Sequence, residues 1–171
     1  MRAEDLRDIQ APLKTRYRTA ADSAVITLKA RGTLGSESIT CKVETGRALV
    51  VAGLHPATGG DGTRVCSGDM LLEALVACAG VTLTAVATAL DVPLRGGTVS
   101  AEGELDVRGT LGVDREVPVG FRAIRLHFDI DSPAGPDQIA TLLRLTERYC
   151  VVFQTLSGHP GLAISHSVIG A

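Results

Sequence analysis

The chain has 171 residues, of which 45% are hydrophobic and 21% are charged. This composition excludes an intrinsically disordered chain. A chain of this length can also bury a hydrophobic core without stabilisation by disulfides or a metal ion. Only 3% of the residues are aromatic and the net charge is −2, which excludes a base-stacking surface and a basic face for nucleic acid or an anionic membrane. The charged N-terminus has no apolar segment of the signal-peptide type, so we expect one cytoplasmic domain over residues 1–171, with reduced thiols.

The first part of the chain is predicted to be rich in strands. Apolar residues at helical spacing predict a short helix over residues 3–13, inside an N-terminal extension of residues 1–16. Alternating apolar and polar residues then predict strands at 23–32, 38–44 and 47–52, with a turn at 32–36. Residues 53–68 are rich in glycine and lack the ending of a phosphate-binding loop. They are either a flexible connector or a loop that shapes a site at the mouth of the next helix.

Residues 70–90 form a long apolar run with a single charge, Glu73. The run is long enough to span a bilayer. However, it is rich in alanine and threonine, and no basic cluster flanks it. We therefore interpret it as a helix that is buried on nearly all sides. Because a domain of this size rarely buries a helix so completely, we expect a second subunit to help cover it.

The last part of the chain continues the mixture of strands and helices. Alternation predicts strands at 98–108 and 121–130, joined by a loop or hairpin connection over residues 109–120. Pro136 then begins a helix whose apolar face ends at Cys150. A break at 158–160 precedes a last strand at 162–169. This order of elements predicts an α+β fold with mostly antiparallel pairing.

Two of the four cysteines are candidates for redox chemistry. No cysteine or histidine has the spacing of a metal ligand, so we expect no metal site. Cys78 lies among small residues that would let another chain element approach its sulfur, although an inert buried cysteine is the alternative interpretation. Cys150 also points inward, and the two sulfurs would meet if their helices pack together. Cys41 and Cys66 are expected to be structural.

Two segments resemble the motifs of a known family. Residues 67–78, SGDMLLEALVAC, resemble the central-helix motif of the OsmC/Ohr proteins. Residues 146–152, TERYCVV, resemble the second motif of that family, in which a cysteine is followed by Pro-Val; here Val151 stands in place of the proline. The two cysteines lie 72 residues apart, which also fits, and the resemblance covers residues 24–170.

The resemblance implies a fold, an assembly and an activity. The fold would have antiparallel sheets around a long buried central helix, in an intertwined homodimer with active sites at the subunit interface. The activity would be thiol-dependent reduction of organic hydroperoxides by a cysteine-based peroxidase of the peroxiredoxin type, acting in the oxidative stress response. Cys78 and Cys150 would form the redox pair, with a dithiol as reductant and no cofactor. The alternative is a non-catalytic relative that binds an apolar small molecule at the dimer interface.

The resemblance also points to a site acid and an activating arginine. The acid, which the family carries near the start of the central helix, would be Asp69 or would be absent. On a continuous helix, Asp69 does not share the face of Cys78. Arg31 is the nearest match to the arginine, with Arg47 and Arg64 as alternatives. Because burial alone would raise the pKa of Cys78, a working thiolate requires a nearby cation, and we predict Arg31.

Overall fold

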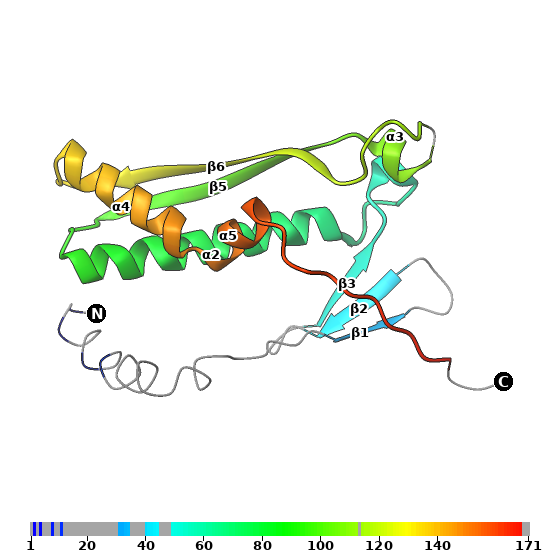
Figure 1. Ribbon diagram of the computed structural model, residues 1–171, viewed down its shortest axis with the longest axis horizontal. Coiled ribbons are helices and arrows are strands. Elements are labelled where there is room, and N and C mark those ends of the chain that lie inside the picture. Colours follow the sequence, from blue (N-terminus) through cyan, green and yellow to red (C-terminus); the bar gives the residue numbers. More distant parts are fainter. Residues whose placement is uncertain are drawn as a thin grey trace.

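The computed structural model describes residues 31–34, 40–44, 49–112 and 114–168, together with the single residues Arg2, Glu4, Asp8 and Ala11. At its centre is the long helix α2 (Ser67–Leu90), which runs alongside an antiparallel ribbon of β5 (Gly96–Leu105) and β6 (Phe121–Asp131) (Figure 1). The helices α4 (Pro136–Tyr149) and α5 (Val151–Ser157) both pack against α2. The fold is therefore α+β, as predicted, with a long central helix and an antiparallel sheet.

A second sheet lies beyond the N-terminal end of α2 (Figure 1). It contains β1 (Arg31–Leu34), β2 (Thr40–Glu44), β3 (Leu49–Gly53) and β4 (Val65–Cys66), in that order. The first three strands pair antiparallel, and β4 pairs parallel to β3. A 3-10 helix, η2 (Pro56–Thr58), lies between β3 and β4. Because β4 continues directly into α2, this sheet fixes the start of the central helix.

The β5–β6 ribbon is apolar on one side and charged on the other, as the alternation in its sequence predicts. On the charged side, Glu102 lies opposite Arg125, with 3.7 Å between a carboxylate oxygen and a guanidinium nitrogen. The other side packs against Leu75 and Ala79 of α2 through five half-buried residues: Val99, Ala101, Ile124, Leu126 and Phe128. The ribbon therefore covers the side of α2 that carries the buried residues.

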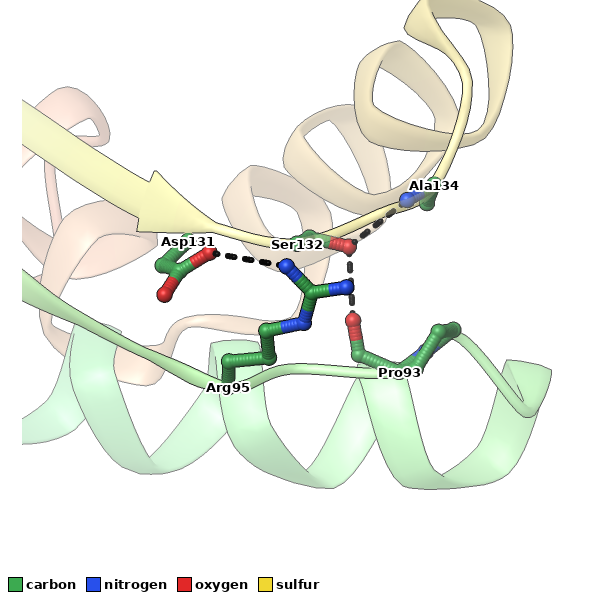
Figure 2. Close-up of polar contacts among 5 residues, drawn as sticks. All are labelled: Pro93, Arg95, Asp131, Ser132 and Ala134. Atoms are coloured by element: carbon green, nitrogen blue, oxygen red, sulfur yellow. Dashed lines mark hydrogen bonds and ion pairs between the residues drawn. The ribbon is translucent and has the colours of Figure 1, made fainter.

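A group of polar contacts joins the segment that follows α2 to the end of β6 and the segment before α4 (Figure 2). The Ser132 hydroxyl donates to the carbonyl oxygen of Pro93 at 2.6 Å and accepts from the backbone N–H of Ala134 at 3.1 Å. Beside it, the Arg95 guanidinium lies 3.9 Å from the Asp131 carboxylate. The backbone N–H of Arg95 also donates to the backbone carbonyl oxygen of Asp131 at 2.9 Å. These contacts hold the segment between α2 and β5 against the segment between β6 and α4.

The start of α2 differs from the prediction. The helix begins at Ser67, three residues before the predicted start at residue 70. Its buried residues follow each other at intervals of four: Leu75, Ala79, Leu83 and Ala87. Within one chain the β5–β6 ribbon, α4 and α5 cover only one side of the helix, and coverage of the other side by a second subunit stays a prediction. Among the described helices, α2 alone is long and apolar enough to cross a membrane, with a mean hydropathy of 2.0. Here it is the central helix of a layered fold.

Several element boundaries also differ from the sequence expectations. Residues 32–34 lie in β1 and not in a turn, while residues 23–30 are outside the described residues. The loop predicted over residues 53–68 contains η2 and β4, and β5 ends at Leu105, before the one-turn helix α3 (Val107–Thr110). Of the predicted N-terminal helix, only Glu4, Asp8 and Ala11 are described, and they are helical.

The predicted last strand is absent from residues 162–168, and residue 169 is outside the described residues. The apolar side chains of this segment, Leu162, Ile164 and Val168, are almost fully exposed. Alternation alone does not make a strand, because a strand also needs a neighbour for its backbone hydrogen bonds. The segment pairs with none of the described strands.

Candidate active site

The structure brings together the two cysteines that the sequence singled out. Cys78 lies in the middle of α2 and is half-buried. Cys150 is the residue between α4 and α5, and its exposed fraction is only 1%. Both thiols are free, and both belong to the apolar cluster around Leu75 and Ala79. The packing of α4 and α5 on α2 therefore makes the two sulfurs neighbours.

The backbone at Cys150 shapes the site in a way the sequence did not predict. Its φ of −72° and ψ of 107° are extended, so α4 stops there and the short helix α5 begins at Val151. The backbone N–H groups of Val151 and Val152 donate hydrogen bonds to the sulfur of Cys78. The hydroxyl of Thr82, one turn along α2, and the thiol of Cys150 donate to the same sulfur. Four donors therefore converge on Cys78.

These donors lower the pKa of Cys78. Burial is the largest single influence, and it raises the pKa because it disfavours a charged sulfur. The hydrogen bonds from Val152, Cys150, Val151 and Thr82 outweigh burial and hold the pKa of Cys78 below its ordinary value. Because thiolates and not thiols are nucleophiles, Cys78 is the sulfur prepared for attack.

The pKa of Cys150 shifts in the opposite direction. Burial raises this pKa most strongly, and the neighbouring Cys78 raises it further by its hydrogen bond and its charge. The backbone N–H groups of Phe153 and Val152 lower the pKa but do not offset burial. The two cysteines therefore titrate as a coupled pair, in which Cys78 loses its proton at a lower pH than Cys150.

The other predicted site residues lie apart from this pair or outside the description. Arg31 begins β1, but its side chain is not described, and Arg47 is outside the described residues. Arg64 is exposed and lies against Gly53. Asp69 is exposed in the first turn of α2, roughly 13 Å along the helix axis from Cys78 at 1.5 Å per residue.

The role of a cation beside Cys78 stays a prediction, because the side chains of Arg31 and Arg47 are not described. No positive charge among the described side chains contributes to the lowered pKa of Cys78, and hydrogen bonds account for it instead. The remaining cysteines lie elsewhere: Cys66 is the N-cap of α2, and Cys41 lies in β2 with a side chain that is not described. Among the described residues, no group of histidine, cysteine or carboxylate side chains could hold a metal ion.

A cavity of about 330 Å³ adjoins Cys150 between α2, β6, α4 and α5. Its wall is mostly apolar and includes Leu126, Phe128, Leu143 and Phe153. The exposed residues Arg144 and Glu147 of α4 stand at its edge, so the cavity reaches the surface. Cys150 lines this cavity, whereas Cys78 does not. Sequence reasoning missed the cavity because its walls come from four separate elements.

The sequence matches the family of OsmC-like proteins over residues 60–165, which is more than half of the chain. No curated protein matches the sequence significantly. An OsmC-like protein from Mycoplasma pneumoniae has a similar structure, with a TM-score of 0.64, 21% identity, and coverage of 78% of this chain and 89% of that one.

Two further structures are similar at low sequence identity. One is an organic hydroperoxide resistance protein OsmC from Legionella pneumophila, with a TM-score of 0.62, 18% identity, and coverage of 79% of this chain and 92% of that one. The other is an organic hydroperoxide resistance protein from Elizabethkingia anophelis with bound thiocyanate, with a TM-score of 0.62, 16% identity, and coverage of 80% and 91%. At these identities the likeness shows the fold.

Proposed function

The chain belongs to the OsmC-like family, and we propose that it reduces organic hydroperoxides with Cys78 and Cys150 as its redox pair. The observation that carries the proposal is the pair of hydrogen-bonded thiols whose pKa values shift in opposite directions. The names of the Legionella and Elizabethkingia proteins, which fold alike, support a substrate of this class. The protein would be a cytoplasmic peroxidase of the oxidative stress response that needs no cofactor.

The reaction assigns one step to each sulfur. The Cys78 thiolate attacks an oxygen of the hydroperoxide and breaks the O–O bond, which gives a sulfenic acid on Cys78 and releases an alcohol after proton uptake. The Cys150 sulfur then attacks the sulfenic sulfur, so a disulfide forms and water leaves. A dithiol returns two electrons and restores both thiols. Cys150 suits the second step because it lies between two helices, where the chain can shift most easily.

A variant series tests this assignment. Cys78→Ser should abolish reaction with the first equivalent of cumene hydroperoxide. Cys150→Ser should react once, accumulate a sulfenic acid and over-oxidise when more peroxide is added. Cys66→Ser is the matched control, because its thiol is also half-buried but lies at the N-terminal end of α2, away from Cys78 in the middle of the helix. Retained turnover in Cys78→Ser would refute the peroxidase.

The roles proposed for Arg31 and Asp69 rest on the family resemblance alone. If Arg31 supports the Cys78 thiolate in addition to the hydrogen bonds, Arg31→Met should lower peroxide turnover while the far-ultraviolet circular dichroism stays native. Unchanged turnover would leave the role to Arg47 or Arg64, or to the hydrogen bonds alone. Asp69→Asn applies the same test to the acid.

We further propose that two chains form a homodimer. The side of α2 opposite its buried residues carries the exposed residues Ala74, Ala77, Val81 and Thr84, and Val81 is 72% exposed. An apolar helix side of this kind is stabilised when another surface covers it, and obligate dimers bury about 2,000 Å² or more. Cys78 lies beside this side of α2, so the active site would lie near the subunit interface. Sedimentation at micromolar concentration tests the assembly.

The cavity beside Cys150 favours one alternative function. A mostly apolar cavity of about 330 Å³ is within the size range of small-molecule sites, so a non-catalytic protein that binds an apolar ligand is the second candidate. Consumption of tert-butyl hydroperoxide in the presence of a dithiol distinguishes the two functions, since only the peroxidase consumes it.

A further inference from the structure

The two thiols of the candidate site are in contact, and no third ligand stands beside them. The Cys150 thiol donates a hydrogen bond to the sulfur of Cys78, and neither cysteine is in a disulfide. Cys66, at the N-cap of α2, lies roughly 18 Å along the helix axis from Cys78 at 1.5 Å per residue. Among the described residues, no further histidine, cysteine or carboxylate completes a group around the pair. The site therefore presents two sulfurs, close enough together to bond to one atom.

We propose that Cys78 and Cys150 bind a trivalent organoarsenical with one organic substituent, and that this substituent lies in the apolar cavity beside Cys150. Arsenic in this state is a soft centre, and thiolates are the ligands that soft centres select. The binding exchanges ligands and transfers no electrons, so it does not depend on the proposed peroxidase. It goes beyond that function, because the ligand neither oxidises nor reduces the pair.

The number of sulfurs favours this ligand over a metal ion. A structural zinc ion needs four ligands in a tetrahedron, whereas this part of the described chain offers two. An organic arsonous acid carries two hydroxyl groups, which thiols displace, and one carbon substituent, which they do not. Its two replaceable bonds match the two sulfurs, so no position on arsenic is left without a partner.

The charge of the product also favours arsenic. The adduct of one organoarsenic group with two cysteine sulfurs is neutral, whereas a soft monovalent ion between two thiolates keeps one negative charge. Cys150 is only 1% exposed, and burial of an unpaired charge is costly. No positive charge among the described side chains acts on either sulfur. A neutral adduct needs no such cation.

The cavity accounts for the organic substituent. Cys150 lines this cavity of about 330 Å³, so a group carried by arsenic at this sulfur can extend into it. The wall offers the apolar side chains of Leu126, Phe128, Leu143 and Phe153. A phenyl or alkyl group fits such a wall, whereas the remaining hydroxyl of arsenite would lose its hydrogen bonds to water there. The site should therefore prefer an organoarsenical to arsenite.

The exchange of bonds is balanced without an oxidant or a reductant. The Cys78 sulfur bonds to arsenic, one As–O bond breaks, and the thiol proton leaves with the hydroxyl as water. Cys150 then displaces the second hydroxyl in the same way, and a second water leaves. Because the first bond holds arsenic beside Cys150, the second step is intramolecular, and such a link strengthens binding by roughly 10²–10⁴-fold over a single attachment.

The probe is phenylarsine oxide, added to the reduced full chain and followed by native mass spectrometry. We expect one phenylarsenic group per chain, with two thiol hydrogens lost and no hydroxyl left on arsenic. Cys78→Ser and Cys150→Ser should each lower the affinity at least about a hundredfold, which is the lower end of the gain from linkage. Cys66→Ser, whose thiol is also half-buried, should bind as the unaltered protein does. A smaller loss in either of the first two variants, or an adduct that keeps a hydroxyl, would overturn the proposal.

The two attachment points can also be mapped without any substitution. The loaded protein is treated with N-ethylmaleimide in urea and analysed by peptide mass spectrometry. We expect the label on Cys41 and Cys66, and none on Cys78 and Cys150 until a competing dithiol removes the arsenic. A label on Cys78 or Cys150 before that step would contradict attachment to both sulfurs.

A further measurement tests the place of the organic group. Leu143→Phe narrows the cavity and should lower the ratio of the phenylarsine oxide affinity to the arsenite affinity at least fivefold. Leu105→Phe, the same change at a partly exposed site outside the cavity, is the control. The ratio cancels any loss that both probes share, so an unchanged ratio in Leu143→Phe would refute the cavity as the site of the substituent. Absence of peroxide reduction in a protein that binds the arsenical normally would refute the peroxidase instead.

Discussion

Replacing Val151 with proline removes one hydrogen-bond donor from Cys78 and leaves the surroundings nearly unchanged. Val151 is the first residue of α5, where proline is well tolerated because its φ suits a helix start. The preceding residue, Cys150, has the extended ψ of 107° that proline demands of its neighbour. The Val151 side chain is 69% exposed, so little packing is lost. The main loss is the N–H that donates to Cys78.

The size of the effect follows from the value of one hydrogen bond to a charged group, which is about 1.5–3 kcal/mol. We use the lower end, because the donors from Val152, Thr82 and Cys150 remain. Since about 1.4 kcal/mol corresponds to a factor of ten, the thiolate fraction of Cys78 should fall roughly tenfold at a pH below its pKa. The sign is fixed, because loss of a donor to the thiolate raises the pKa. At a pH above the pKa in both proteins, the difference should vanish.

The assay is the rate at which iodoacetamide alkylates Cys78, followed by peptide mass spectrometry between pH 6 and pH 10. The pH profile of Val151→Pro should be displaced to higher pH, and that of the control Val151→Ala, which keeps the N–H, should not. In the unaltered protein, Cys78 should react at lower pH than Cys150. If Val151→Pro keeps its profile and its native circular dichroism, the backbone donors do not set the reactivity of Cys78, and a cation such as Arg31 must do so.

Three further outcomes are expected. Thr82→Val should slow alkylation of Cys78 at neutral pH in the same assay, because it removes another donor to the thiolate. Val81→Asp places a charge on the open side of α2 and should shift the proposed homodimer to monomer in sedimentation, whereas a dimer of unchanged affinity would show that this side is not the interface. Leu142→Ala empties a fully buried position and should lower the free energy of unfolding by about 2–5 kcal/mol in urea titration.

The elements that the sequence predicted well are those whose burial pattern is complete within one chain. The ribbon of β5 and β6 alternates because one side packs on α2 and the other meets water. The segment with Leu162, Ile164 and Val168 alternates in the same way but forms no strand over its described residues. Alternation indicates which side chains favour burial, but it does not indicate which strand would pair with the segment. The apolar composition of α2 likewise predicts that the helix is covered, but it does not indicate which surface covers it.

The sequence singled out Cys78 and Cys150 but could not show that they meet, since that depends on how their helices pack. The structure places both in one apolar cluster. The sequence indicated that the apolar face of the helix ends at Cys150, but the second helix that begins directly after it shows only in the backbone of the structure. In an unbroken helix, the N–H groups of Val151 and Val152 would donate to carbonyl oxygens four residues earlier. The break makes them the unpaired first donors of a new helix, free to bind the sulfur of Cys78. A search for a charged side chain therefore misses these donors, because two of the four are peptide N–H groups, which any residue other than proline would supply at the same break.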